Sequence, residues 1–377
     1  MNILEEIQSC PVEWKELGEV CSVNKGKQLN KNLLTDDGLY PAYNGGQTYS
    51  GRTNDYNVEA NTIIVSQGGA SAGFVNFVET KFWANAHCYY ILPDETQVNN
   101  RFVYHFLKMN QKYLMDFQHG AGIPALKSDK LTKLLIPVPP IKIQEKIVQI
   151  LDKFTDYVTE LTSELTSRKK QYSYYRDKLL SFEDEVYQVE WKKLDEIAEN
   201  LDSKRKPVAK GGRSSGVYPY YGASGIVDYV DDFIFDGDFL LISEDGANLV
   251  VRKTPIAFSI TGKTWVNNHA HVLKFDNMIN QKFVNYYLNN IDLSPYISGA
   301  AQPKLNQQNL NNIKIPYPSL EIQSRIVQVL DNFDTVCNDL NIGLPKEIEL
   351  RQKQYKYFRE KLLTFVAEGE YTESRVE

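Results

Sequence analysis

The chain has 377 residues, of which 42% are hydrophobic and 24% are charged, and these values are ordinary for a globular protein with two or more domains. No run of about 18 apolar residues occurs, so no membrane span is expected. Residues 1–10 have no basic stretch before an apolar core and do not resemble a signal peptide. The four cysteines are scattered and form no Cys-x-x-Cys pair, so we expect reduced thiols in a cytoplasmic protein.

Two short stretches are basic although the formal net charge is −6. Residues 203–213 carry five basic side chains and no acid, and residues 24–31 carry three lysines and no acid. An acidic chain argues against a protein that binds DNA on its own, because phosphate neutralisation normally requires a basic domain. Local patches still allow DNA binding when a partner supplies further contacts, and solvated loops are the alternative interpretation.

The same motifs occur twice along the chain, in the same order. The offset between the copies grows from 177 (residue 191 minus residue 14) to 183 (residue 351 minus residue 168). This spacing is far too long for a solenoid repeat, so the two halves of the chain are predicted to be homologous. The repeated segments are 14–20 and 191–197, 40–43 and 218–221, 83–87 and 265–269, 120–126 and 299–305, 136–154 and 315–333, and 168–182 and 351–365.

Each half begins with a strand-rich part and ends with a helical part. In the first half, short apolar runs such as 62–65 and 89–92 are bounded by turn residues and predict strands, and one helix is predicted over 101–115. Three prolines, the last of them Pro140, then interrupt the chain. Apolar residues over 143–182 recur at spacings of three and four, which predicts one amphipathic helix of about 40 residues and about 60 Å.

The second half repeats this plan, with strands over 191–316 and a helix from about residue 319. The offset grows by four residues after Phe333, and Pro345 in the added segment predicts a break of the second helix near 343–345. A long helix with one apolar stripe needs a partner, so the two helices are expected to form an antiparallel coiled coil. The predicted fold class is therefore α+β, with two homologous domains separated by two long helices and related by a pseudo-twofold axis.

None of the candidate catalytic motifs has the required spacing. Gly262-Lys-Thr264 looks like the end of a phosphate-binding loop, but residue 257 is alanine where that pattern needs glycine. The glycine-rich segment 68–73 is not followed by an acidic residue at ribose-binding distance in a βαβ pattern. No Asn-Pro-Pro-Tyr or Asp-Pro-Pro-Tyr motif of the kind that adenine methyltransferases use is present. We therefore expect a chain without catalytic or cofactor-binding residues.

The histidines give no clear metal site. His269-Ala-His271 could supply two metal ligands, but no cysteine or further histidine clusters nearby, and Tyr89 occupies the place of His271 in the first half. The repeat makes His87 equivalent to His269, and Asn85 equivalent to Asn267. We expect a shared structural role for these residues, such as a buried hydrogen bond. Base reading is the less favoured alternative for these histidines and asparagines, because two domains that read different sequences should differ at their reading positions.

Two repeated blocks identify a family. One is Ile-Pro-x-Pro followed by Ile-Gln and Ile-Val-Gln-x-Leu-Asp-x-Phe, at 136–154 and 315–333, and the other is the Arg-x-Lys-Gln-Tyr block at 168–182 and 351–365. Together they resemble the Type I restriction–modification specificity subunits, and the resemblance covers essentially the whole chain. The tract at 159–165 (Thr-Glu-Leu-Thr-Ser-Glu-Leu) resembles the tetrapeptide spacer of one subgroup of that family.

The resemblance implies a non-catalytic subunit that binds double-stranded DNA. Each strand-rich unit would be a target recognition domain that reads one half of a split, asymmetric sequence. The long helices would set the distance between the halves and dock two methyltransferase subunits, which use S-adenosylmethionine. Separate motor-nuclease subunits, which use ATP and Mg, would complete the restriction enzyme. No cofactor would be bound by this chain itself.

The same resemblance implies the domain boundaries and the residues that contact DNA. Residues 1–139 and 187–318 would be the two recognition domains, 140–183 and 319–367 the helices, and 368–377 a tail. Arginine suits guanine, and asparagine or glutamine suits adenine, so candidate base-reading residues are Asn44, Gln47, Gln67, Arg213, Asn248 and Arg252. Candidate phosphate contacts, where charge matters more than geometry, are Lys25, Lys27, Lys204, Arg205 and Lys206.

Two other classes of protein remain as alternatives. A methyltransferase or nuclease acting alone would need the catalytic motifs that are absent, and it would bind S-adenosylmethionine when purified alone. A protein- or glycan-binding scaffold, with two β-rich domains on a coiled coil, is compatible with the net charge of −6. A gel-shift assay on random duplexes, with and without a methyltransferase partner, separates the scaffold from a DNA-reading subunit.

Overall fold

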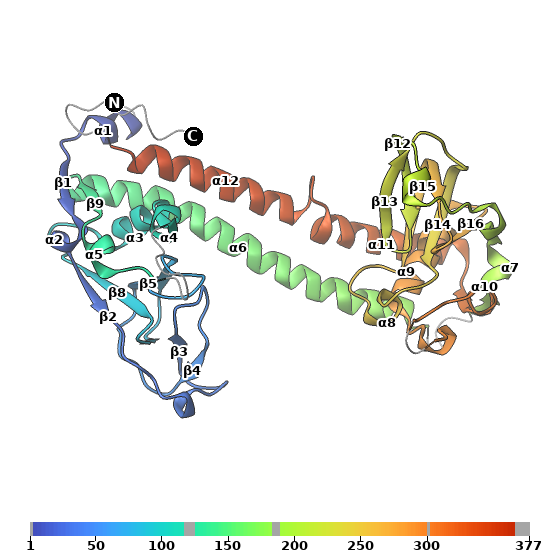
Figure 1. Ribbon diagram of the computed structural model, residues 1–377, viewed down its shortest axis with the longest axis horizontal. Helices are drawn as coiled ribbons and strands as arrows, with labels where there is room; N and C mark the ends of the chain where they lie inside the picture. The colour runs from blue at the N-terminus through green and yellow to red at the C-terminus, as the bar shows by residue number, and fades with distance from the viewer. Residues whose placement is uncertain (1–2, 117–124, 183–188, 300–301, 366–377) are drawn as a thin grey trace. The chain divides into compact units, whose positions relative to one another are not determined.

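The computed structural model describes residues 3–116, 125–182, 189–299 and 302–365 (Figure 1). The chain divides into two compact units, Met1–Thr162 with Glu347–Glu377, and Ser163–Lys346. The expected tail at 368–377 and most of the repeated block at 120–126 lie outside the described residues. No helix in the described ranges is both long and apolar enough to cross a membrane.

The first unit contains a four-stranded antiparallel sheet in the order β2-β8-β5-β6, a three-stranded sheet β4-β3-β7 and a two-stranded sheet β1-β9. The central strand β5 is a run of five buried residues, as expected for a strand covered on both faces. The elements before the long helix are α1 (Ile3–Ser9), β1 (Glu13–Glu16), α2 (Leu17–Val20), β2 (Cys21–Lys25), η1 (Lys31–Leu33), β3 (Tyr40–Tyr43), β4 (Gly51–Thr53), β5 (Thr62–Ser66), β6 (Val75–Val78), β7 (Trp83–Ala84), β8 (Cys88–Pro93), α3 (Asn100–Met109), α4 (Gln111–Asp116), α5 (Ser128–Thr132) and β9 (Leu135–Val138).

The helix predicted over 101–115 is two helices, α3 and α4, that meet at Asn110. The side chain of Asn110 donates to the carbonyl of Phe106 at 2.9 Å. Asparagine competes for backbone groups in this way and favours helix ends over helix interiors. The apolar face of α3 is buried against β5, β6 and β8, so the interruption does not disturb the core of the domain.

The second unit contains a six-stranded sheet in the order β11-β16-β14-β15-β12-β13 and a two-stranded sheet β10-β17. Its elements before the helices are β10 (Glu190–Lys193), α7 (Leu194–Ile197), β11 (Glu199–Asn200), η2 (Asp202–Lys204), η3 (Lys210–Gly212), β12 (Ser215–Gly222), β13 (Gly225–Val230), β14 (Phe235–Ser243), α8 (Asn248–Val251), β15 (Ala257–Val266), β16 (Ala270–Lys274), α9 (Met278–Asn290), η4 (Ser294–Tyr296), α10 (Gln307–Asn311) and β17 (Lys314–Tyr317). The α+β class and the two homologous domains are therefore confirmed.

Two of the repeated motifs pair with each other in each domain. Trp14 on β1 lies opposite Pro137 on β9, and Trp191 on β10 lies opposite Pro316 on β17, in the same antiparallel register. The first and last strands of each domain therefore close it with one small sheet. This pairing explains why the tryptophan motif and the Ile-Pro-x-Pro motif repeat together.

The helical parts are α6 (Ile141–Leu180), α11 (Leu320–Asn338) and α12 (Leu344–Leu363). In the first unit, Phe154 of α6 stacks on Phe358 of α12, with ring centroids 5.1 Å apart. In the second unit, Tyr172 of α6 stacks on Phe333 of α11, while Leu180 shares a core with Ile326. Later residues of α6 thus meet earlier residues of α11, so α6 and α11 run antiparallel.

The break between α11 and α12 has a steric cause. A Cβ atom at Gly343 would lie 2.4 Å from the carbonyl oxygen of Thr335, so only glycine fits there. Pro345 is the second residue of α12, where its missing N–H removes no helical hydrogen bond. The glycine therefore permits the turn and the proline favours the start of the next helix.

An aspartate of the repeated Leu-Asp-x-Phe motif ties each domain to its helix. In the first unit, Asp152 accepts a hydrogen bond from Arg101 at 2.5 Å and contacts the buried ring of His105 at 2.7 Å. In the second unit, Asp331 accepts from Lys282 at 2.6 Å and from Tyr286 at 2.7 Å. The side chains that donate from α3 and α9 differ, but the accepting aspartate occupies the same position of the repeated motif in both units.

Candidate nucleic-acid interface

One end of the central sheet in the first unit gathers several loops. Antiparallel pairing brings the end of β2, the end of β5 and the start of β8 to the same edge, with Lys25 opposite Tyr89 and Ser66 opposite Cys88. The turn between β7 and β8, residues 85–87, lies at this edge. We call this region the loop end of the domain.

Hydrogen bonds fix the loop after β2 and the loop after β3 to this turn. The indole of Trp83 donates to the carbonyl of Lys27 at 2.9 Å. The backbone N–H of Asn85 donates to the carbonyl of Tyr43 at 2.9 Å. The loops that carry the expected DNA contacts are therefore held by the repeated tryptophan and asparagine.

The loop after β5 is held in the same place. The backbone N–H of Gln67 donates to the carbonyl of His87 at 2.8 Å, and the hydroxyl of Ser66 donates to the carbonyl of Gly46 at 3.1 Å. The structure thus brings all five candidates of the first domain to one surface, although the first and last are 42 positions apart (67 minus 25). Lys25, Lys27, Asn44 and Gln47 are exposed there, and Gln67 is half-buried.

The second domain builds the same frame. Trp265 donates to the carbonyl of Lys206 at 2.6 Å, and the N–H of Asn267 donates to the carbonyl of Tyr221 at 3.0 Å. These contacts match those of Trp83 and Asn85. The interface of each domain is therefore set by side chains that the two halves share.

The loop after β14 completes the match. The N–H of Glu244 donates to the carbonyl of His269 at 2.9 Å, and its carbonyl accepts from Leu305 at 2.8 Å. In the first domain Gln67 makes the same two backbone contacts, the second of them with Leu126 at 2.7 Å. Glu244 therefore takes the place of Gln67.

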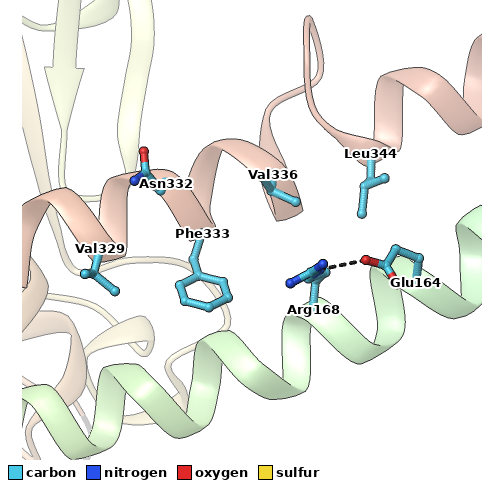
Figure 2. Close-up of a pocket in the computed structure, with 7 residues that line it drawn as sticks. All are labelled: Glu164, Arg168, Val329, Asn332, Phe333, Val336 and Leu344. Carbon is cyan, nitrogen blue, oxygen red and sulfur yellow. Dashed lines mark hydrogen bonds and ion pairs between the residues drawn. The ribbon is translucent and has the colours of Figure 1, made fainter.

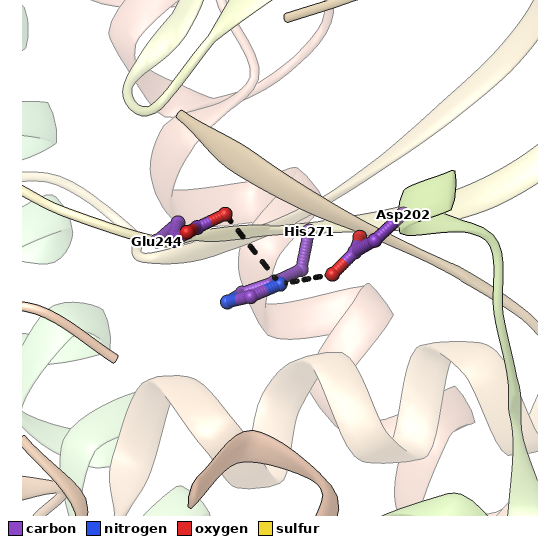
Figure 3. A group of neighbouring side chains, drawn as sticks. All are labelled: Asp202, Glu244 and His271. Carbon is purple, nitrogen blue, oxygen red and sulfur yellow. Dashed lines mark hydrogen bonds and ion pairs between the residues drawn. The ribbon is translucent and has the colours of Figure 1, made fainter. Parts of the chain in front are cut away.

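The side chains inside the two frames differ in charge. In the first domain, the hydroxyl of Tyr89 donates to the carbonyl of Leu126 at 3.3 Å. In the second, the ring of His271 takes this place, with Nε2 2.7 Å from the carbonyl of Leu305. Its Nδ1 lies 2.5 Å from Asp202 and 3.9 Å from Glu244, and dashed lines mark both contacts in Figure 3. The neutral hydrogen bond between Tyr89 and Leu126 in the first domain is thus replaced, in the second, by a network of charged side chains around His271.

Arg205 completes this charged network. Its guanidinium contacts Glu244 at 2.6 Å and Asp202 at 3.3 Å, and it donates to the carbonyl of Ala270 at 2.8 Å. Burial alone would raise the pKa of Asp202, but the hydrogen bond and charge of His271 hold that pKa below its usual value. Burial would likewise raise the pKa of Glu244, and the hydrogen bond from Arg205 lowers it.

The network has the composition of a metal site, since atoms of Asp202, Glu244 and His271 lie within 4.8 Å of one another. Its charges, however, are paired within the protein. Both ring nitrogens of His271 face acceptor atoms, so each must carry a hydrogen to bond them. A metal ion would have to displace these hydrogens and Arg205, so we describe the group as an ion-pair network.

Several candidates of the second domain make internal contacts instead of facing a ligand. Arg252 donates to the carbonyls of Leu288 and Ile291 at the end of α9, at 3.3 and 2.8 Å. Asn248 forms reciprocal hydrogen bonds with Thr254 at 2.9 and 3.1 Å. Both side chains would have to break these bonds to reach a base, so the geometry does not support them as base-reading residues.

The two other arginines in the candidate set are also occupied. Arg213 pairs with Asp228 at 3.0 Å and lies over the ring of Tyr220. Arg205 belongs to the ion-pair network, so its assignment as a phosphate contact does not fit, because its guanidinium already neutralises two carboxylates. Lys204 and Lys206 are exposed on either side of it and stay candidates for phosphate contacts.

The expected shared role of the asparagine and histidine pairs holds only for the asparagines. Asn85 and Asn267 are buried, and each side chain accepts a hydrogen bond within the turn. His87 and His269 are exposed, and His269 contacts Asp245 at 2.8 Å. Sequence reasoning missed Asp245. The sequence did contain a signal, because the position of Asp245 is occupied by Gly68 in the first half, and positions that differ between the halves are the ones expected to read DNA.

A groove lies along the helices of the second unit (Figure 2). It has a volume of about 460 Å³ and is lined by apolar side chains of α11 and by an ion pair on α6 between Arg168 and Glu164, at 2.7 Å. The lining residues are Glu164, Arg168, Val329, Asn332, Phe333, Val336 and Leu344. Exposed apolar surface of this kind is typical of protein docking sites.

The fold and the two matching loop frames define an α+β protein with two domains built on one plan. The family model of the Type I restriction modification DNA specificity domain matches residues 11–168 and again residues 188–350. The chain belongs to this family, which confirms the expectation drawn from the repeated motifs.

Individual relatives agree with this family. A Type I restriction enzyme specificity subunit of Escherichia coli is 31% identical over 97% of this chain and 97% of its own length. A proposed specificity subunit of Haemophilus influenzae is 41% identical over 180 residues, which cover 47% of this chain and 46% of that protein. The crystal structure of a Type I S subunit from M. genitalium matches with a TM-score of 0.70 and 22% identity, over 95% of this chain and 98% of that chain.

Proposed function

We propose that this chain supplies the DNA sequence specificity of a Type I restriction–modification complex, and that each strand-rich domain reads one half of a split, asymmetric target. The observation that carries the proposal is the loop frame that is built twice. Shared tryptophan and asparagine side chains hold the loops in both domains, while the side chains inside and around the frame differ. Two readers of different half-sites need this combination of a common scaffold and divergent contacts.

The exposed polar residues of the loop ends would contact the DNA. In the first domain, Asn44 and Gln47 are free to face bases, and each good pair with a base discriminates by about 1–3 kcal/mol. Lys25 and Lys27 in the first domain, and Lys204 and Lys206 in the second, would contact phosphates.

The helices would set the spacing between the half-sites and dock two methyltransferase subunits. The exposed aromatic side chains Tyr157, Tyr174 and Tyr357 on the helices, and the apolar groove on α11, support a docking role. The docked subunits would bind S-adenosylmethionine, and motor-nuclease subunits would use ATP and Mg. Such a complex would act on DNA in the cytoplasm. The tract at 159–165, which is helical throughout, would belong to a tetrapeptide spacer.

A binding assay tests this proposal. The purified chain should bind duplex DNA weakly, because it is acidic and has only short basic stretches. Addition of two methyltransferase subunits should give tight binding to one split sequence among random duplexes. Nanomolar sequence-specific binding by the chain alone at physiological salt would contradict the dependence on partners. No DNA binding with any partner would favour the protein- or glycan-binding scaffold.

A further inference from the structure

The turn of the second domain carries an ion pair at its exposed tip. The Nδ1 atom of His269 lies 2.8 and 3.1 Å from the two carboxylate oxygens of Asp245. A carboxylate can only accept, so Nδ1 carries the hydrogen and Nε2 is the ring atom that is left for a ligand. The side chains are 52% and 35% exposed, and an exposed pair of this kind contributes little to stability.

The first domain has the same histidine without the carboxylate. Gly68 occupies the place of Asp245, because Gly68 bridges Ala125 in the way that Asp245 bridges Lys304. His87 is exposed at the equivalent tip. The two domains thus share the residue but differ in what orients it. Two readers with one frame would acquire different preferences in this way.

The ion-pair network holds Asp245 in place. Its neighbour Glu244 is fixed by Arg205 at 2.6 Å and by Lys304 at 3.1 Å. The strand that follows His269 is fixed by the ring of His271, which is fully buried. Both partners of the exposed pair are therefore attached to a rigid interior, which reduces the entropy lost when a ligand binds.

The charges around the pair favour a DNA acceptor as its ligand. Lys204 and Lys206 are exposed on the loop that Trp265 ties to the same turn. With Nδ1 bonded to a carboxylate, Nε2 would face the DNA acceptor and donate its hydrogen to it. The ring of His271, two positions further on, shows this arrangement with acceptors on both nitrogens.

We propose that His269, oriented by Asp245, is a specificity-determining contact of the second domain, and that its Nε2–H donates to N7 on the edge of a purine base. This inference rests on the proposed function and adds a residue to it. Asp245 is a positioning residue, because it acts through the ring. Among the residues that the structure describes, no carboxylate contacts the ring of His87.

The test uses the complex of the full chain with its methyltransferase subunits and measures the affinity for duplexes that carry the complete target. His269→Ala should lose about tenfold in affinity, the equivalent of about 1.4 kcal/mol. Asp245→Gly, which reproduces the first domain, should lose less. Both variants should keep the wild-type melting temperature, since the pair is exposed.

Modified DNA identifies the acceptor. Each purine of the second half-site is replaced by its 7-deaza analogue, and each phosphate by a methylphosphonate. At one position, the modification should weaken binding by the wild-type complex, whereas it should cause no further loss of affinity in the complex with His269→Ala. A 7-deaza position would identify a base edge, whereas a methylphosphonate position would identify a phosphate contact and overturn the specificity role. The proposal is overturned if, at every position, the loss caused by the DNA modification adds to the loss caused by His269→Ala. It is also overturned if His269→Ala binds with wild-type affinity.

A matched variant separates this inference from the proposed function. His87→Ala should leave discrimination within the second half-site unchanged, and an equal loss there would overturn the assignment to His269. If the wild-type complex prefers no sequence, the proposed function itself fails. If it discriminates normally and His269→Ala does too, only the role of His269 is refuted.

Discussion

The two recognition domains have the same loop frame but different interiors. The first places the neutral side chains of Gln67 and Tyr89 behind its turn, whereas the second places Glu244 and His271 there, joined by Asp202 and Arg205. The frame depends on backbone carbonyls and on a tryptophan and an asparagine that both domains contain. Positions inside the frame can therefore change without moving the loops, which is how one fold can present two reading surfaces.

The difference also has an energetic consequence. A hydrogen bond between neutral groups contributes about 1 kcal/mol, and its loss is modest. Buried charges are costly to desolvate, and removal of one partner leaves the others uncompensated. The second domain should therefore be the more sensitive of the two to changes within its frame. Four predictions test this comparison, in order of decreasing effect.

The largest effect should come from exchange of a whole domain. Replacement of residues 187–318 by the equivalent domain of a relative should change one half of the methylated target and leave the other half intact. The measurement is the methylated sequence in cells that carry the hybrid. A change in both halves, or in neither, would show that the domains do not read independently.

An insertion in α6 should change the spacing and not the bases. One more Thr-Ser-Glu-Leu unit after Leu165 adds about 6 Å and about 400° of helix, so the apolar stripe stays nearly in phase. DNA advances about 3.4 Å per base pair, so about 6 Å of added helix corresponds to one or two base pairs. The unread spacer between the half-sites should therefore grow by about one or two base pairs.

A two-residue insertion at the same place is the control. It rotates the stripe by about 200° and should abolish assembly. The methylated motif is determined for both variants. An active four-residue variant with an unchanged spacer would show that α6 does not set the distance between the two half-sites.

Arg205→Met should destabilise the second domain by about 3–5 kcal/mol, because it removes the guanidinium that pairs with both buried carboxylates and leaves Glu244 to Lys304 and Asp202 to His271. The matched change in the first domain, Tyr89→Phe, removes one hydrogen bond to Leu126 and should cost about 1 kcal/mol. Urea unfolding of both variants gives the two values. Equal losses would mean that the charged interior is no more sensitive than the neutral one.

Acid should produce the smallest difference. The pKa values of Asp202 and Glu244 are lowered in the folded state, so both add stability above their unfolded pKa values, and this stability is lost as the pH falls through the lowered values. Glu244→Gln removes one of these groups. Its melting temperature should therefore fall less than that of the wild type between neutral pH and pH values below about 4. A parallel decline of both proteins would exclude Glu244 from the acid response.

The sequence alone determined the features that depend on local order along the chain. The repeat predicted two homologous domains. The three-and-four spacing over 143–182 predicted α6, and Pro139 and Pro140 separate β9 from α6. The last two signals are read within a few residues, because helical periodicity and proline act on the neighbouring backbone. The helix over 101–115 was predicted as one because the competition of Asn110 for a backbone carbonyl is hard to see in a periodic pattern.

Only the tertiary structure decided which side chains are available to DNA. Arg205 belongs to a basic stretch, yet it is neutralised by Glu244, 39 positions away, and by Asp202. His271 meets Asp202 across 69 positions, and His269 meets Asp245 across 24. These partners are brought together by strand pairing in the central sheet, and nothing in the local sequence specifies the distance between two side chains on different strands. A charge pattern shows where DNA contacts could lie, whereas the fold decides which charges are already paired.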